Sequence, residues 1–329
     1  MKKLKKIGKI LIVFLLVFLL TGCTNPVYKK TINKGKKVKE VVKYTKGKNA
    51  TGQSLTENII CKPTNKELIK IYKDNKVNTD KLVDCKKFEP KINTKQTLWD
   101  NIFIKPLAWV ILKLGYLVKN FGLAVILVGL VIRLILYPVT KKSAMQSENL
   151  KKAQPELQRL EKKYANKMDD QQAMMAKSQE MMAIYKKYNI SLFSGCLIAI
   201  IQLPLFIAFL EAINRTPAIF EGKFLGLQLG TTPWFALSKG NFWYLIIPVI
   251  VFIVTFLSLK LNGTQATDNS NPAAGSTKMM MNMMTVIITI SSFQLSTAIG
   301  LYWITSSLFT VIQNLLVARS GNSAKIKKS

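Results

Sequence analysis

The 329-residue sequence contains no histidine at all. This absence excludes histidine-based catalytic triads, histidine metal ligands and histidine proton relays. The four cysteines include no CxxC pair, so no zinc site is indicated. The sequence also lacks a glycine-rich loop of the kind that binds nucleotide phosphates. We therefore expect a protein without a metal or a cofactor.

Acidic residues are scarce: 17 Asp and Glu stand against 48 Lys and Arg, for a net charge of +31. Such an excess is typical either of nucleic-acid-binding proteins or of membrane proteins with basic flanks. The hydrophobic share of 49% and several apolar runs of bilayer length favour the membrane. Most of the positive charge would then face anionic lipid headgroups.

One apolar run, residues 121–140, is long enough to cross a bilayer and carries a single charge, Arg133. An arginine at the centre of a span costs about 2.5–3.5 kcal/mol on insertion scales, so a chain that retains one generally uses it. Arg133 precedes Thr140 by only two helical turns, so its side chain could also snorkel to the headgroups. This segment alone leaves both readings open.

Residues 1–22 have the pattern of a secretory signal, with lysines, an apolar stretch at 10–20 and then small residues. The small residues before Cys23 resemble the lipobox of bacterial lipoproteins, in which the cysteine is lipidated, with palmitate as the expected acyl group. Such an anchor would place the next residues on the outer face of the bacterial cell membrane. The alternative is an uncleaved signal anchor.

Residues 23–105 form a Lys-rich segment that we expect to be extracytoplasmic and partly disordered. Residues 24–105 contain 20 lysines and 8 acidic residues, and the stretch 29–53 has the composition of a disordered chain. Residues 65–72 predict a short helix. Cys61 and Cys85 lie in a compartment that permits disulfides, but the sequence leaves open whether they pair.

The remaining apolar stretches predict an all-α polytopic membrane protein with a five-span core. Residues 106–119 are typical of an outer interfacial helix with Trp109 as an aromatic anchor, or else begin a longer first span. Lys141 and the basic tail 320–329 fit the cytoplasmic side under the positive-inside rule. The core covers 120–319, with spans at about 121–139, 191–210, 242–261, 279–297 and 299–318.

Residues 140–190, between the first two spans, predict a cytoplasmic hairpin of two helices. Apolar residues form one stripe along 144–165, and Asp169 or Asp170 can cap a second helix over 171–187. This second helix either packs its methionines against the first helix or presents them as an adaptable peptide-binding surface. Its methionines are Met174, Met175, Met181 and Met182.

Spans four and five each carry a polar stripe at helical spacing. Ordinary helix packing explains either stripe alone, because Ser and Thr are common between membrane helices. Two stripes together with Gln202 and Arg133 indicate instead a shared water-accessible cavity, which favours a functional Arg133. The stripes are Thr285, Thr289, Ser292 and Ser296 in span four, and Trp303, Ser306, Thr310 and Gln313 in span five.

This arrangement resembles the YidC/SpoIIIJ/Oxa family of membrane protein insertases over residues 98–319. The order and spacing match the five-span core of the Gram-positive members, which also tend to have lipoprotein signals. The chain departs from the family pattern at Gly129 and at 295–300, and its two-cysteine outer segment has no counterpart there. The resemblance rests on the sequences of 122–140, 153–164, 194–209, 279–284 and 300–316.

The resemblance implies an insertase and chaperone that inserts and helps to fold integral membrane proteins through a hydrophilic groove, alone or with the Sec translocon. Because insertion makes and breaks no covalent bond, and the sequence has no nucleotide-binding loop, the resemblance also implies that the protein is not an enzyme. The family's central arginine corresponds to Arg133. The implied partners are nascent membrane proteins and lipids, with the Sec translocon and the ribosome as further candidates and no DNA. The predicted groove residues are Arg133, Gln202, Leu203, Phe206, Ser292, Ser296, Tyr302, Trp303 and Ser306.

Two other classes compete with this hypothesis. Pro204 and Pro248, which lie within predicted spans, would be compatible with a channel or secondary transporter. Against this class, the sequence shows no inverted repeat, and a transporter has no need of a charged 50-residue hairpin. A surface lipoprotein anchored by its spans would need only a lipid and one span, which makes five polar-striped spans superfluous.

Overall fold

The computed structural model describes residues 25–33, 36–94, 96–166, 170–191, 194–261 and 272–326, and these confirm the nearly all-α fold class. The predicted signal 1–22, Cys23 and the last three tail residues lie outside the described residues. The helices are α2 (Lys66–Asp74), α3 (Lys105–Leu117), α4 (Phe121–Tyr164), α5 (Gln171–Lys187), α6 (Ser194–Asn214), α7 (Pro217–Glu221), α8 (Pro233–Ser238), α9 (Ile246–Leu261), α10 (Pro272–Gln294) and α11 (Thr297–Ile326), with single turns η1 (Cys85–Lys87), η2 (Asp100–Ile104) and η3 (Phe242–Leu245).

Contacts divide the chain into two compact units, and each is described by itself. Several helices contribute to both, so the unit boundaries fall within them. Unit 1 comprises Met1–Gly129, Ile200–Pro248 and Ser291–Trp303, and unit 2 comprises Leu130–Ala199, Val249–Ile290 and Ile304–Ser329.

Three helices among the described residues are long and apolar enough to cross a membrane: Phe121–Tyr164, Phe242–Leu261 and Thr297–Ser320. They coincide with predicted spans one, three and five. The other two predicted spans, 191–210 and 279–297, fall on α6 and α10, and the described apolar part of α6, Ile201–Asn214, is shorter. The count of five spans therefore stays a prediction.

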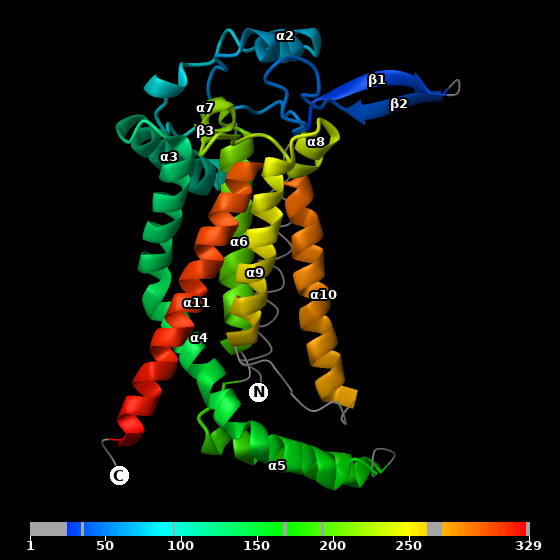
Figure 1. The fold of residues 1–329 in the computed structure, drawn as a ribbon, viewed down its shortest axis with the longest axis vertical. Helices are drawn as coiled ribbons and strands as arrows, with labels where there is room; N and C mark the ends of the chain where they lie inside the picture. Colours follow the sequence, from blue (N-terminus) through cyan, green and yellow to red (C-terminus); the bar gives the residue numbers. More distant parts are fainter. Residues whose placement is uncertain are drawn as a thin grey trace. The chain divides into compact units, whose positions relative to one another are not determined.

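The N-terminal part of unit 1 is folded, so the expectation of disorder over 29–53 is wrong for the described residues. Strands β1 (Tyr28–Asn33) and β2 (Lys36–Val41) pair antiparallel, and the chain beyond them packs against α2 and α7 (Figure 1). Tyr44 is buried with Phe220 of α7. Local composition did not predict this folded structure, because Phe220, against which Tyr44 is buried, lies far away in the sequence.

The helix predicted over 65–72 is α2, and its start has a clear cause. The side chain of Asn65 accepts hydrogen bonds from the backbone N–H groups of Glu67 (2.9 Å) and Leu68 (3.4 Å), which are otherwise unpaired in the first turn. Leu68 and Tyr72 then turn one face of the helix into the core.

The segment 106–119 forms a helix separate from the first span. Helix α3 ends at Leu117, Lys119 takes a left-handed conformation with φ of 54°, and α4 begins at Phe121. The Asn120 side chain accepts from the N–H of Leu123 at 3.0 Å and so caps the new helix. The alternative of one longer first span is thereby wrong, while the interfacial position of α3 remains a prediction.

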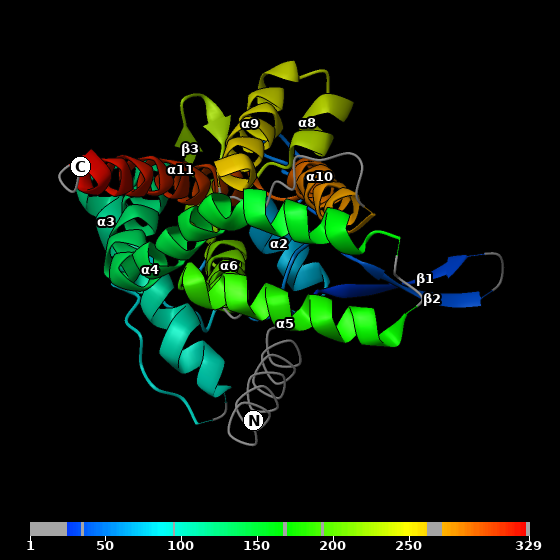
Figure 2. The same cartoon turned by 90° about the horizontal axis from the view of Figure 1, so that it is seen from below.

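The first span and the first hairpin helix are one helix, which belongs to unit 2 from Leu130 onward. Helix α4 is 44 residues long and continues through Pro138 and Pro155. Helix α5 folds back alongside its last part (Figure 2), and Asp170 caps α5 by accepting from Gln172 N at 2.8 Å. The predicted helical hairpin is present in the structure.

Candidate functional site

The side chain of Arg133 is buried in unit 2, with only 7% of the residue exposed. Its Nε donates to the hydroxyl of Ser306 on α11 at 2.8 Å, and a second guanidinium nitrogen donates to the same oxygen. A snorkelling arginine would direct its charge away from the neighbouring helices towards the headgroups. Here the guanidinium contacts another helix, at Ser306, which belongs to the polar stripe predicted in span five.

A second polar contact lies two turns further along the same helices. Thr140 donates to Oε1 of Gln313 at 3.1 Å, and both residues are buried. The sequence separation is 173 residues in this pair and in the Arg133–Ser306 pair, so α4 and α11 run parallel and in register here. Parallel direction is what the predicted topology requires of spans one and five. We call these four residues the polar seam.

Between the two contacts of the polar seam, Tyr137 meets Phe309 edge to face with ring centroids 6.4 Å apart. The seven-residue repeat of the contacts is the spacing at which two helices stay face to face in a left-handed pair. Neither Thr140 nor Gln313 was among the predicted groove residues. Gln313 could have been predicted from the sequence, because it lies seven residues after Ser306 in the same polar stripe.

In unit 1, the predicted contacts of α6 and α11 come together as an aromatic cluster. Phe206 lies edge to face against Trp303 at 5.0 Å and tilted against Tyr302 at 6.4 Å. Gln202 Nε2 donates to the Tyr302 hydroxyl at 3.4 Å, a weak hydrogen bond. The aromatic cluster consists of Gln202, Phe206, Phe209, Tyr302 and Trp303.

Phe209 is the member of this cluster that the sequence analysis missed. Its ring stacks on Tyr302 with centroids 3.9 Å apart, and it is fully buried. Its position three residues after Phe206, on the same helix face, was the available signal. Leu203, by contrast, is 39% exposed and stands outside the ring contacts.

Ser292 of α10 and Ser296, in the turn between α10 and α11, are buried in unit 1. The hydroxyl of Ser296 is buried without a hydrogen-bond partner among the described residues. Earlier in α10, in unit 2, the hydroxyl of Thr289 donates to the carbonyl of Thr285 in the same helix at 2.8 Å. At least one hydroxyl of this polar stripe therefore forms its hydrogen bond within its own helix, which is what ordinary helix packing predicts.

The hairpin contains the same ionic contact twice. Lys163 and the Tyr164 hydroxyl bind Glu180 at 2.7 and 2.9 Å, and Lys187 and the Tyr188 hydroxyl bind Glu156 at 2.6 and 2.8 Å. At the end of each hairpin helix, a Lys-Tyr pair thus donates hydrogen bonds to a glutamate of the opposite helix. The hydrogen bonds from Lys187 and Tyr188 lower the pKa of Glu156, and those from Lys163 and Tyr164 lower the pKa of Glu180.

The methionines of α5 divide between the two predicted readings. Met181 packs against the small core formed by Leu160, Tyr164 and Ala173. Other methionines stay at the surface, and Met175 is 61% exposed. The hairpin core therefore uses one methionine, while others are available on its surface. The exposed set is Met174, Met175 and Met182.

Comparison with known proteins gives concordant matches. The model of the 60Kd inner membrane protein family matches residues 113–325, which include the whole polar seam and aromatic cluster. The membrane protein insertase YidC of Oceanobacillus iheyensis is 34% identical over 232 residues, covering 70% of this chain and 87% of that protein. The insertase MisCA of Bacillus subtilis is 33% identical over 230 residues, covering 70% and 82%. YidC of Alkalihalophilus pseudofirmus is 35% identical over 230 residues, covering 68% and 84%.

Proposed function

The chain belongs to the 60Kd inner membrane protein family and is a non-catalytic membrane protein insertase, and from that premise we propose that Arg133 is the centre of its substrate path. Its substrates are membrane proteins, and it is itself a multi-pass protein of the cell membrane. The observation that carries the proposal is the burial of the Arg133 guanidinium against Ser306.

The physical problem of insertion is the transfer of a polar tail across about 30 Å of hydrocarbon. A groove that is open to the cytosol and lined by polar groups shortens the dry part of that distance. Arg133 adds a positive charge inside the span, so an acidic group on the tail costs less to hold there than it would alone. The Thr140–Gln313 contact of the polar seam offers further polar groups on the same two helices.

The membrane potential supplies direction. With the outside positive, moving one negative charge outward gains about 2.3 kcal/mol per 100 mV. An acidic tail that has paired briefly with Arg133 is then drawn onward. The substrate's apolar segment meanwhile leaves towards lipid along the aromatic cluster, where the rings of Phe206 and Trp303 and the exposed Leu203 offer apolar contact.

The attachment and the partners form a second layer of the proposal. Lipidation at Cys23 would add an anchor on the outer face, which the lipobox-like sequence supports. The insertase would act alone or beside the Sec translocon. The basic tail 320–329 would bind ribosomal RNA, because lysines bind RNA phosphates.

The test is complementation of a bacterial strain depleted of its own insertase, with one substrate whose translocated tail is acidic and one whose tail is neutral. We expect Arg133→Ala to fail with the acidic tail and Arg133→Lys to retain much of the activity, because charge is the property used. Arg159→Ala, at an exposed position of the hairpin, is the matched control. Full activity of Arg133→Ala with the acidic tail would overturn the proposal.

A further inference from the structure

The N-terminal segment before the family match is built into unit 1 with the matched helices. The family model begins at residue 113, yet the disulfide-linked Cys61 and Cys85 lie in one apolar core with Ala208 and Ala212 of α6. The sequence had left that pairing open, and it is formed in the structure. We call the described residues between 25 and 105 the N-terminal brace.

The first tie between brace and core is Arg215, which directly follows α6 and is only 3% exposed at its side chain. Its Nε donates to the carbonyl of Asn58 at 2.8 Å, and its guanidinium forms an ion pair with Asp100. In return, the N–H of Ile60 donates to the Arg215 carbonyl at 2.8 Å. Glu211, one turn back on α6, lies 3.3 Å from the same guanidinium.

Most of the polar partners of this buried arginine therefore come from the brace, while Arg215 itself belongs to the part of the chain that the family model matches. A buried charge that loses its partner is strongly destabilising, because desolvation is no longer compensated. The end of α6 thus depends on the brace being docked.

A second tie runs from the brace to α11. The N–H of Thr232 donates to the carbonyl of Thr51 at 3.0 Å, and the neighbouring Thr231 carbonyl accepts from the N–H of Thr297 at 3.0 Å. Thr297 is the first residue of α11. Gly52 makes the close approach possible, since a Cβ there would lie 2.4 Å from Phe235 and its φ is +73°.

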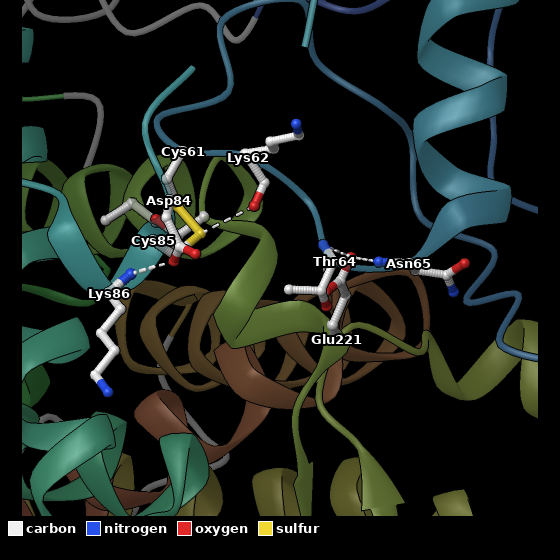
Figure 3. Close-up of a disulfide and its surroundings, with 10 residues drawn as sticks. Cys61, Lys62, Thr64, Asn65, Asp84, Cys85, Lys86 and Glu221 are labelled. Atoms are coloured by element: carbon white, nitrogen blue, oxygen red, sulfur yellow. Dashed lines mark hydrogen bonds between the residues drawn. A yellow bond between two sulfur atoms is a disulfide. The ribbon is translucent and has the colours of Figure 1, made fainter. Parts of the chain in front are cut away.

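A third tie holds α7. Glu221 accepts from the backbone N–H groups of Thr64 and Asn65, each at 3.2 Å, and Asn65 is also the cap of α2 (Figure 3). Figure 3 shows the disulfide on the same stretch of chain, with Cys85 Sγ 3.4 Å from the Lys62 carbonyl. The three ties place the brace on the end of α6, on α7, and on residues 231–232, which hold the start of α11.

Two of the tied helices carry the aromatic cluster. Phe209 lies less than two turns before Arg215 on α6, Tyr302 less than two turns after Thr297 on α11, and their rings stack at 3.9 Å. We propose that the N-terminal brace positions the ends of α6 and α11 and so sets the geometry of the aromatic cluster, with Arg215 as its central positioning residue. This inference rests on the proposed function for the role of that cluster.

The test starts with hydrogen exchange on the full-length protein in lipid nanodiscs. Arg215→Gln and Asp100→Asn should increase exchange at Ile60 and also in peptides covering 209–222 and 297–303. Arg159→Gln and Asp74→Asn are controls at exposed positions with the same charge changes. Increased exchange confined to 25–105 would overturn the inference, because the brace would then not hold the two helices.

A glycine pair provides a test that changes no charge. Gly52→Ala should undock the brace by collision with Phe235. Gly226→Ala has a similar φ of +80° but no atom within 4 Å of the added Cβ, so it controls for backbone strain. Equal exchange in the two variants would contradict the second tie.

The functional readout is a ratio of photo-crosslinks to a substrate, from position 303 in the cluster and from position 175 on the hairpin. Undocking should lower the first yield several-fold relative to the second, with partial rescue by Arg215→Lys. A general loss of protein would lower both yields alike, which would refute a positioning role. Failure of the proposed groove would instead show as an active Arg133→Ala, whatever the exchange results.

Discussion

Arg133 on α4 and Ser306 on α11 are joined by a hydrogen bond of 2.8 Å, although 173 residues separate them in the sequence. The same separation recurs in the contact between Thr140 and Gln313. Two helices whose polar residues the sequence analysis assigned to one cavity are thus paired directly along the polar seam. The seam explains how an arginine is tolerated inside a membrane protein, since its charge is hydrogen-bonded within the fold.

Ser306→Ala should weaken the pairing of α4 and α11. The substitution removes an acceptor from a buried guanidinium, and a buried polar group that loses a partner costs about 1–3 kcal/mol. Thermal unfolding in detergent measures the loss. Thr310→Ala is the control, because the Thr310 hydroxyl bonds at 3.0 Å to a carbonyl of its own helix. Equal shifts in both variants would show that the Ser306 contact adds no stability of its own.

Removing the disulfide should loosen the N-terminal brace without unfolding the spans. Cys61 and Cys85 are 24 residues apart, and a disulfide that closes a loop of that size contributes roughly 2–4 kcal/mol. Hydrogen exchange of peptides from 60–88 should rise in Cys61→Ser, in Cys85→Ser and in the reduced wild type. The double variant should add little to either single one, and an additive effect would contradict a single shared bond.

The docking of the brace should weaken in acid through Asp100. Burial raises the pKa of its carboxyl, but hydrogen bonds from Thr97 and Arg215 and the charge of Arg215 outweigh burial and hold the pKa below its ordinary value of 3.8. A carboxyl with a lowered folded-state pKa stabilises the fold above its unfolded pKa, and this stabilisation is lost as pH falls through the folded pKa.

Exchange at Ile60 should therefore accelerate as the pH falls below 3.8, after correction for the intrinsic pH dependence of exchange. Asp100→Asn should remove most of this acceleration, whereas Asp74→Asn should retain it. An unchanged acid response in Asp100→Asn would assign the effect to other carboxyls.

The hairpin methionines should separate into structural and surface residues. Met181→Gln should destabilise the hairpin by roughly 0.5–3 kcal/mol, because Met181 packs on the Leu160 core. Met175→Gln, at a site that is 61% exposed, should leave its stability unchanged. Denaturant unfolding followed by hydrogen exchange in 153–187 makes the comparison, and the reverse order of effects would refute this packing.

The sequence by itself located the longer helices and the apolar runs of three spans, at 121–139, 242–261 and 299–318. Asn65 caps α2 and Asp170 caps α5, as short-range hydrogen bonding predicts. The runs that became α4 and α11 were recognisable because membrane insertion depends on the length and hydrophobicity of one continuous segment. Arg133 stood out for the same reason, since a charge within such a run is costly wherever the neighbouring helices lie.

Only the tertiary structure decided what each polar or apolar residue touches. Within the described part of 29–53, Val42 and Tyr44 are buried in a core with the distant Phe220, a contact that local composition could not indicate. Arg215 attracted no attention in the sequence because its partners Asn58 and Asp100 lie more than 100 residues away. Hydrogen bonds and buried contacts act over a few ångströms in space, so they link residues that no local sequence pattern brings together.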